Sequence, residues 1–351
     1  MHRIPSGLAP VLFFPGLMFE ALIRARSRLY MASLLPQRRL PAPVISIGNI
    51  TMGGSGKTPL VIHVAQMLAK LGFIPAVLSR GYGRIEPKKI LVLSPGETVS
   101  SPARILGDEP ALIRRHIPSA FMGIARKRFL AGDLIAKKQQ RVIFLLDDGF
   151  QHRKLHRDLD IVIIDGSQPL GSNHVFPRGT LREPLSELLR CQIIMINGTQ
   201  DGAGTNWVME EIRRHHPTAA IFYCKQTIQS LAPFPEWKED LGSQSVSARP
   251  VYLVAALGNP DRFREDVEKL GIEIRGTKFF PDHYWLKPKD WIACIEEARR
   301  KNAGAIIITE KDAVKISHPP DFPLLVSIQS TEVSNAQEFE HTLKKCAGER
   351  S

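Results

Sequence analysis

The chain has 351 residues, of which 43% are hydrophobic and 23% are charged, a composition that excludes a disordered chain and a length that favours two domains. Lysine and arginine outnumber aspartate and glutamate by 47 to 35, so the net charge of +12 favours anionic partners such as nucleotides, nucleic acids or anionic lipids. The four cysteines lie far apart without a CxxC pair, which argues against a zinc site or a disulfide framework.

The N-terminal segment joins an apolar run to arginines. Residues 8–19 read LAPVLFFPGLMF, and Arg24, Arg26 and Arg28 follow. The run is shorter than the about 20 residues that a transmembrane helix needs. We expect residues 1–40 to form a membrane-associating segment, with apolar side chains in the lipid surface and arginines at anionic headgroups. The alternative is a helix that packs in the protein core.

A glycine-rich segment follows the first expected strand, Val44–Ile47, and opens an expected helix, Lys57–Leu71. Glycines let backbone N–H groups approach phosphate oxygens, and a helix N-terminus favours anions. Lys57 would reach the β- and γ-phosphates of ATP, and the Thr58 hydroxyl would bind Mg²⁺. Thr51 stands where the GxxxxGK[ST] pattern has its first glycine. The residues assigned to nucleotide binding are Thr51, Met52, Gly53, Gly54, Ser55, Gly56, Lys57 and Thr58.

Apolar strands alternate with helical stretches through the first domain, residues 41–225. Further strands are expected at Pro75–Leu78, Lys89–Leu93, Val142–Leu146, Ile161–Ile164, Gln192–Ile196 and Ala220–Tyr223, and further helices at Glu109–His116, Arg126–Lys137 and Trp207–His215. Runs such as VIFLL and IVII are apolar throughout, as in strands buried on both faces. The pattern predicts a P-loop NTPase-like α/β fold with a mainly parallel sheet and helices on both faces.

Two acidic residues end the strand expected at Val142–Leu146. Asp147 and Asp148 would lie at the carboxyl end of a strand, where open α/β sheets place ligands. A carboxylate there would bind the Mg²⁺ that accompanies ATP. The alternative is a helix cap. The residues alone do not decide which of the two carboxylates contacts the metal.

The chain changes character after Tyr223. The stretch from Lys225 to Pro250 is rich in Ser, Pro and Gln, and residues 226–250 are interpreted as a linker. Residues 251–351 are expected to form a second, smaller α/β domain. Its expected strands are Val251–Ala255, Ala305–Ile308 and Leu324–Ser327, and its expected helices are Arg262–Leu270 and Lys289–Lys301.

Eight motifs, in order along the chain, resemble the tetraacyldisaccharide 4'-kinases. They are GNITMGGSGKTP (48–59), SRGYGR (79–84), GDEP (107–110), LDDGFQHRKLHRDLDIVIID (146–165), LREP (181–184), GNPDRF (258–263), DHYWL (282–286) and TEKDAVK (309–315). The family also carries Ser or Thr at the position of Thr51 and an apolar N-terminal segment. The resemblance implies Mg²⁺-dependent transfer of the γ-phosphate of ATP to the 4'-hydroxyl of a lipid-linked glucosamine disaccharide 1-phosphate. It also implies a peripheral protein on the cytoplasmic face of the bacterial inner membrane.

The resemblance extends to four site residues. Asp108 resembles the family's catalytic aspartate, which would act as base for the sugar hydroxyl, and His283 resembles the histidine that supports it. Arg182 would stabilise charge on the moving phosphoryl group, and Glu183 would help to hold Mg²⁺. From the residues alone, Asp108 could be a helix N-cap, His283 a core residue, and the Arg-Glu pair a solvated ion pair.

Other classes of function fit the sequence less well. The runner-up is another P-loop NTPase or small-molecule kinase at the membrane surface. A GTPase would carry an Asn-Lys-x-Asp signature, and the chain has no Asn-Lys pair. No nucleic-acid-binding module appears, so no nucleic acid partner is expected, and a monomer is expected. A structural membrane adaptor would leave the acidic pair unexplained. The roles of Arg80, Gln151, His152, Lys311 and Asp312 stay open.

Overall fold

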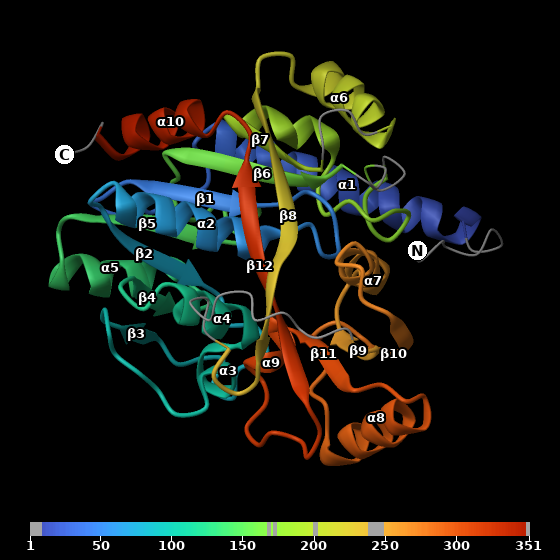
Figure 1. The fold of residues 1–351 in the computed structure, drawn as a ribbon. Coiled ribbons are helices and arrows are strands. Elements are labelled where there is room, and N and C mark those ends of the chain that lie inside the picture. The colour runs from blue at the N-terminus through green and yellow to red at the C-terminus, as the bar shows by residue number, and fades with distance from the viewer. Residues whose placement is uncertain (1–8, 167–169, 171–173, 199–202, 238–248, 349–351) are drawn as a thin grey trace.

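A computed structural model describes residues 9–166, 170, 174–198, 203–237 and 249–348 (Figure 1). Its strands are β1 Val44–Gly48, β2 Ile74–Ser79, β3 Leu91–Leu93, β4 Phe121–Ile124, β5 Val142–Asp147, β6 Leu159–Asp165, β7 Ile193–Asn197, β8 Ala220–Pro233, β9 Val251–Ala256, β10 Ile274–Phe280, β11 Ala305–Thr309 and β12 Leu324–Val333. Its helices are α1 Ala9–Met31, α2 Lys57–Lys70, α3 Pro102–Leu106, α4 Asp108–His116, α5 Arg128–Lys138, the 3₁₀ helix Leu185–Arg190, α6 Ala203–His215, α7 Pro260–Glu268, α8 Pro288–Arg300, α9 Glu310–Ala313 and α10 Ala336–Gly348.

All of these strands belong to one sheet, in the order β10-β9-β11-β12-β8-β7-β6-β1-β5-β2-β4-β3. Neighbouring strands pair in parallel except β8 with β12 and β3 with β4. Strands β1, β5 and β6 are buried along their whole length, because helices cover both faces of this part of the sheet. The predicted mainly parallel α/β fold is therefore confirmed.

The stretch interpreted as a linker begins as a strand. β8 continues through Lys225 to Pro233 and pairs on one side with β7 and on the other with β12 (Figure 1). Buried and more exposed residues alternate along it, so Gln226 and Ile228 face inward while Lys225 faces solvent. Because polar residues occupy the more exposed positions, this part of β8 lacks the continuous apolar run that marked other strands in the sequence. Residues 238–248 of the expected linker lie outside the described part.

Sequence reasoning also missed β4, β10 and α10. β4 has only four residues and contains a glycine, and β10 lies at the edge of the sheet with partly exposed residues. Helix α10 covers the sheet with its buried Phe339 and Leu343. Short or half-polar elements such as these give weak periodicity.

Helix α1 leaves large apolar side chains exposed to solvent. Phe14, Met18 and Leu22 are 71%, 68% and 67% exposed, and their four-residue spacing puts them on one face. Ser27 and Tyr30, nearer the end of the helix, are buried against the rest of the protein. The apolar face of α1 is therefore not packed in the protein core, in contrast to the alternative given above.

No helix within the described ranges is both long and apolar enough to cross a membrane.

Candidate active site

The carboxyl ends of the parallel strands border a cavity of about 770 Å³. The loop after β1, the acidic pair at the end of β5 and residues 257–259 after β9 line it, together with Asp282, His283 and Lys311. Open α/β sheets bind their ligands at this edge. Motifs from both predicted domains therefore meet in one cavity.

The phosphate loop contributes Gly53, Gly54, Ser55, Gly56, Lys57 and Thr58 to the cavity wall. Gly56 precedes α2 with a φ of +88°, a conformation that glycine adopts without a steric penalty. Burial lowers the pKa of Lys57, and the nearby charge of Asp148 opposes that effect. Lys57 Nζ lies 3.8 Å from Asp148 Oδ1.

Thr51 and Met52, also predicted to bind the nucleotide, do not line the cavity. Thr51 forms an isolated bridge with Leu181, and the Met52 N–H donates to the Thr180 carbonyl at 2.7 Å. These two residues join the phosphate loop to the segment that carries Arg182. Thr51 and Met52 therefore anchor the loop, and their contact with the nucleotide stays a prediction.

The two carboxylates at the end of β5 lie in different electrostatic environments. Asp147 Oδ2 accepts a hydrogen bond from Ser79 Oγ at 2.8 Å, whereas its buried Oδ1 has no hydrogen-bond partner among the described residues. Burial, with the charges of Glu109 and Asp148, raises the pKa of Asp147 to about 7. Arg182 Nη1 donates to both oxygens of Asp148 at 2.9 Å. Burial opposes ionisation of Asp148, but Lys57 and Arg182 outweigh it and lower its pKa.

The acidic pair and Thr58 fit the ligand set of a nucleotide-bound Mg²⁺. An unpartnered buried carboxylate oxygen is costly unless a cation or proton satisfies it. Mg²⁺ in phosphotransfer sites is held by one or two carboxylates together with phosphate oxygens and waters. The described residues contain no group of three or more His, Cys, Asp or Glu side chains that could hold a metal by themselves.

Asp108 and His283 meet across the two predicted domains. His283 Nδ1 lies 2.8 Å from Asp108 Oδ2. His283 lines the cavity and has a φ of +63°, a strained conformation of the kind that clusters at functional sites. Asp108 begins α4 and is 4% exposed. The contact therefore joins a buried carboxylate to a side chain of the cavity wall.

The pKa of His283 is raised and the pKa of Asp108 is lowered. The hydrogen bond to Asp108 raises the pKa of His283, against the effects of burial and of Lys311. Burial alone would raise the pKa of Asp108, but the hydrogen bond from His283 and the charge of Lys311 lower it. Lys311 Nζ lies 4.0 Å from Asp108 Oδ2 and donates to Asp282 Oδ1 at 3.0 Å. The pair is thus held as a carboxylate beside an imidazole that binds a proton readily.

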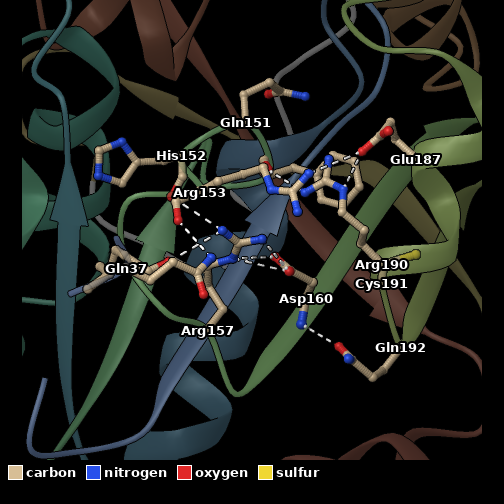
Figure 2. A network of polar contacts seen from close by, with 12 residues as sticks. Gln37, Gln151, His152, Arg153, Arg157, Asp160, Glu187, Arg190, Cys191 and Gln192 are labelled. Carbon is tan, nitrogen blue, oxygen red and sulfur yellow. Dashed lines mark hydrogen bonds and ion pairs between the residues drawn. The ribbon is translucent and has the colours of Figure 1, made fainter. Parts of the chain in front are cut away.

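Glu183, predicted as a metal ligand, is part of a buried ion-pair network. It is 4% exposed, does not line the cavity and accepts a hydrogen bond from Arg190. Arg190 Nε also contacts Glu187 Oε2 at 2.7 Å, and Glu187 accepts from Ser27 of α1 at 2.7 Å. Figure 2 shows Arg190, Glu187 and Arg153 in this network. A carboxylate already paired with a buried arginine stabilises the loop that holds Arg182.

The structure also places the residues whose roles the sequence left open. Arg80, Gln151, His152 and Lys311 line the cavity, and Gln151 Nε2 donates to the Asn49 carbonyl at 3.0 Å. Burial and Arg128 lower the pKa of His152 to about 3, so this imidazole is neutral. Asp312 is 2% exposed and bonds Lys315 Nζ at 2.8 Å and the Ala256 N–H at 3.1 Å. It therefore ties α9 to the end of β9.

Sequence reasoning overlooked other polar residues of the cavity. Glu109 and Asp282 line it and stand inside motifs quoted above, each beside the residue that was chosen. Arg128 lines it too, with Nη1 3.1 Å from His152 Nδ1. Arg128 lies in a basic stretch without a motif, so no sequence signal marked it.

Comparison with known proteins finds a family match along nearly the whole chain. Residues 8–347 match the tetraacyldisaccharide-1-P 4'-kinase family. This chain belongs to the tetraacyldisaccharide 4'-kinase family. A member named tetraacyldisaccharide 4'-kinase from Desulfotalea psychrophila is 32% identical over 94% of each chain, and one from Syntrophus aciditrophicus is 33% identical over 97% of this chain and 92% of its own.

The chain also shares its fold with a solved structure of a family member. The crystal structure of LpxK from Aquifex aeolicus in complex with ATP superimposes with a TM-score of 0.72 at 27% identity. The match covers 97% of this chain and 99% of that one. The similarity in fold therefore extends over nearly the whole chain.

Proposed function

We propose that this member of the tetraacyldisaccharide 4'-kinase family transfers the γ-phosphate of ATP to the 4'-hydroxyl of a tetraacyldisaccharide 1-phosphate. The observation that carries the proposal is the single cavity in which a phosphate loop, an acidic pair and an Asp–His pair meet. A phosphate loop alone serves many NTPases, whereas a proton acceptor facing the loop suits transfer to an alcohol.

Several groups of the chain act on the nucleotide. The backbone N–H groups of the phosphate loop and Lys57 hold the phosphates, and Arg182 faces the charge that develops during transfer. Arg182 is already oriented by its two bonds to Asp148. Mg²⁺, held by Asp147, Asp148 and Thr58, would neutralise charge on the phosphate oxygens.

The Asp108–His283 pair accepts the proton of the sugar hydroxyl. Asp108 is the proposed base, and His283, whose Nδ1 lies 2.8 Å from Asp108 Oδ2, supports it from the cavity wall. Lys311 holds Asp282 beside it. A hydroxyl that loses its proton as it attacks phosphorus needs such a positioned acceptor.

Helix α1 holds the protein on an anionic membrane where a lipid substrate resides. Its exposed apolar face would enter the lipid, and Arg24, Arg26 and Arg28 would meet anionic headgroups. This supports a peripheral location on the cytoplasmic face of the bacterial inner membrane. We also propose the division into a membrane segment 1–40, a kinase lobe 41–225 and a smaller lobe 251–351, connected through the β8–β12 pair.

The direct test is a transfer assay. Purified protein is incubated with Mg²⁺, ATP and the detergent-solubilised disaccharide lipid, and the lipid is analysed by mass spectrometry. The expected product is heavier by one phosphate and forms only when all three components are present. ATP hydrolysis without a phosphorylated lipid would instead favour the other P-loop NTPase reading.

A further inference from the structure

Two buried amides hold the backbone of the phosphate loop from the side of the sheet. Asn197, the last residue of β7, donates from Nδ2 to the Ser55 carbonyl at 3.2 Å. Gln226 of β8 donates from Nε2 to the Gly56 carbonyl at 2.8 Å. The Asn197 amide also donates to Gln226 Oε1 at 3.2 Å. The two side chains thus form one unit that grips the last two carbonyls before Lys57.

The fit between this amide pair and the loop is close. Asn197 is 1% exposed and Gln226 is 8% exposed. A Cβ atom at Gly56 would lie 2.4 Å from the Gln226 amide and 2.7 Å from Asn197 Nδ2. A side chain at position 56 would therefore displace the two amides, and the positive φ also favours glycine there.

The smaller lobe contacts the same unit. Arg262, from the first turn of α7, donates from Nη2 to Asn197 Oδ1 at 3.1 Å. The adjoining loop also approaches the phosphate loop, since a Cβ atom at Gly258 would lie 3.2 Å from the Gly54 N–H nitrogen. The lobe that supplies His283 therefore also reaches the loop that holds the phosphates.

We propose that Asn197 and Gln226 are positioning residues that set the phosphate loop for nucleotide binding, and that Arg262 couples them to the smaller lobe. A loop must present its N–H groups in one fixed orientation to bind phosphate, and the two amides fix the opposite, carbonyl side of the same peptides. Because Arg262 holds the Asn197 oxygen, the amide keeps its nitrogen toward Ser55. This inference rests on nucleotide binding within the proposed function.

The test measures ATP affinity directly by calorimetry on purified protein without lipid. Asn197→Asp and Gln226→Glu keep size but remove the donated hydrogen bonds, and each should weaken ATP binding by about tenfold. Gln226→Met removes the donor without adding charge and should give a similar loss. Asn206→Asp, exposed on α6, is the matched control and should bind as the wild type does.

Steady-state kinetics separates positioning from a general structural role. The KM for ATP should rise about tenfold in Asn197→Asp while the KM for the lipid and kcat at saturating ATP change less than about threefold. A mere loss of folded protein would lower kcat without moving the KM for ATP. Unchanged ATP affinity in all three amide variants would overturn the inference.

A double-mutant cycle tests the coupling. Arg262→Ala should weaken ATP binding in the wild type but add little in Asn197→Ala, because its partner is gone. Additive losses would mean that Arg262 contacts the nucleotide by itself and would overturn the coupling. If the wild-type protein bound no ATP, the proposed function would fail instead, so the two failures are distinguishable.

Discussion

Replacing Phe14, Met18 and Leu22 with serine should detach the protein from membranes. Full burial of one such side chain contributes about 2 kcal/mol. About two thirds of each side chain is exposed and free to enter lipid, so the three together should contribute about 4 kcal/mol. That free energy corresponds to about 10³-fold weaker partitioning onto vesicles.

The assay is sedimentation with vesicles that contain phosphatidylglycerol, at low and high salt. The wild type should bind more weakly at high salt because salt screens the arginines, and the triple variant should bind weakly at both. Ile85→Ser with Ile292→Ser is the control, since these side chains are 67% and 57% exposed outside α1. Wild-type binding by the triple variant would refute the membrane role of α1, and a large loss of thermal stability would show that this face packs in the protein.

Four further predictions concern the site. Asp108→Asn should lower single-turnover phosphorylation by about 10²–10⁴-fold with ATP affinity nearly intact, and adding His283→Ala should cost little more; fully additive losses would contradict a joint role. Lys57→Ala should lower turnover by about 10²-fold or more, and unchanged turnover would exclude the phosphate-loop assignment. Arg190→Met leaves Glu183 buried without its cation and Glu187 with Arg153 alone, so urea unfolding should show a loss of about 3–5 kcal/mol. The raised pKa of His283 means that its pairing with Asp108 stabilises the fold fully below pH ~6.5 and less as pH rises through that pKa. The difference in unfolding free energy between wild type and His283→Gln should therefore shrink as the pH rises from about 6.5 through the raised pKa of His283. A difference that stays constant over this rise in pH would show that the pair does not titrate there.

The parts of the site that were predicted from sequence are those whose chemistry is local. Lys57 and Thr58 follow their glycines directly, and the acidic pair ends an apolar strand, so position along the chain determined their place in the fold. Pairing of Asp108 with His283, 175 residues away, came from the family resemblance, because no periodicity relates two residues on different lobes.

Other features required three-dimensional packing. Glu183 follows Arg182 directly, yet one side chain joins a buried ion pair and the other faces the cavity. Asn197 and Gln226 carry no motif, and their contact with the phosphate loop depends on the order β8-β7-β6-β1 in the sheet. β8 was cut short in the prediction because a strand with a polar face resembles irregular chain.

The central claim is that the chain phosphorylates a lipid-linked disaccharide at one hydroxyl. The most direct measurement follows the label from γ-³²P-ATP into tetraacyldisaccharide 1-phosphate and locates the new phosphate by ³¹P NMR, with a 4'-deoxy substrate as control. We predict one new monophosphate at the 4' position and no transfer to the deoxy substrate. Phosphate at another position, or label released only as inorganic phosphate, would contradict the account.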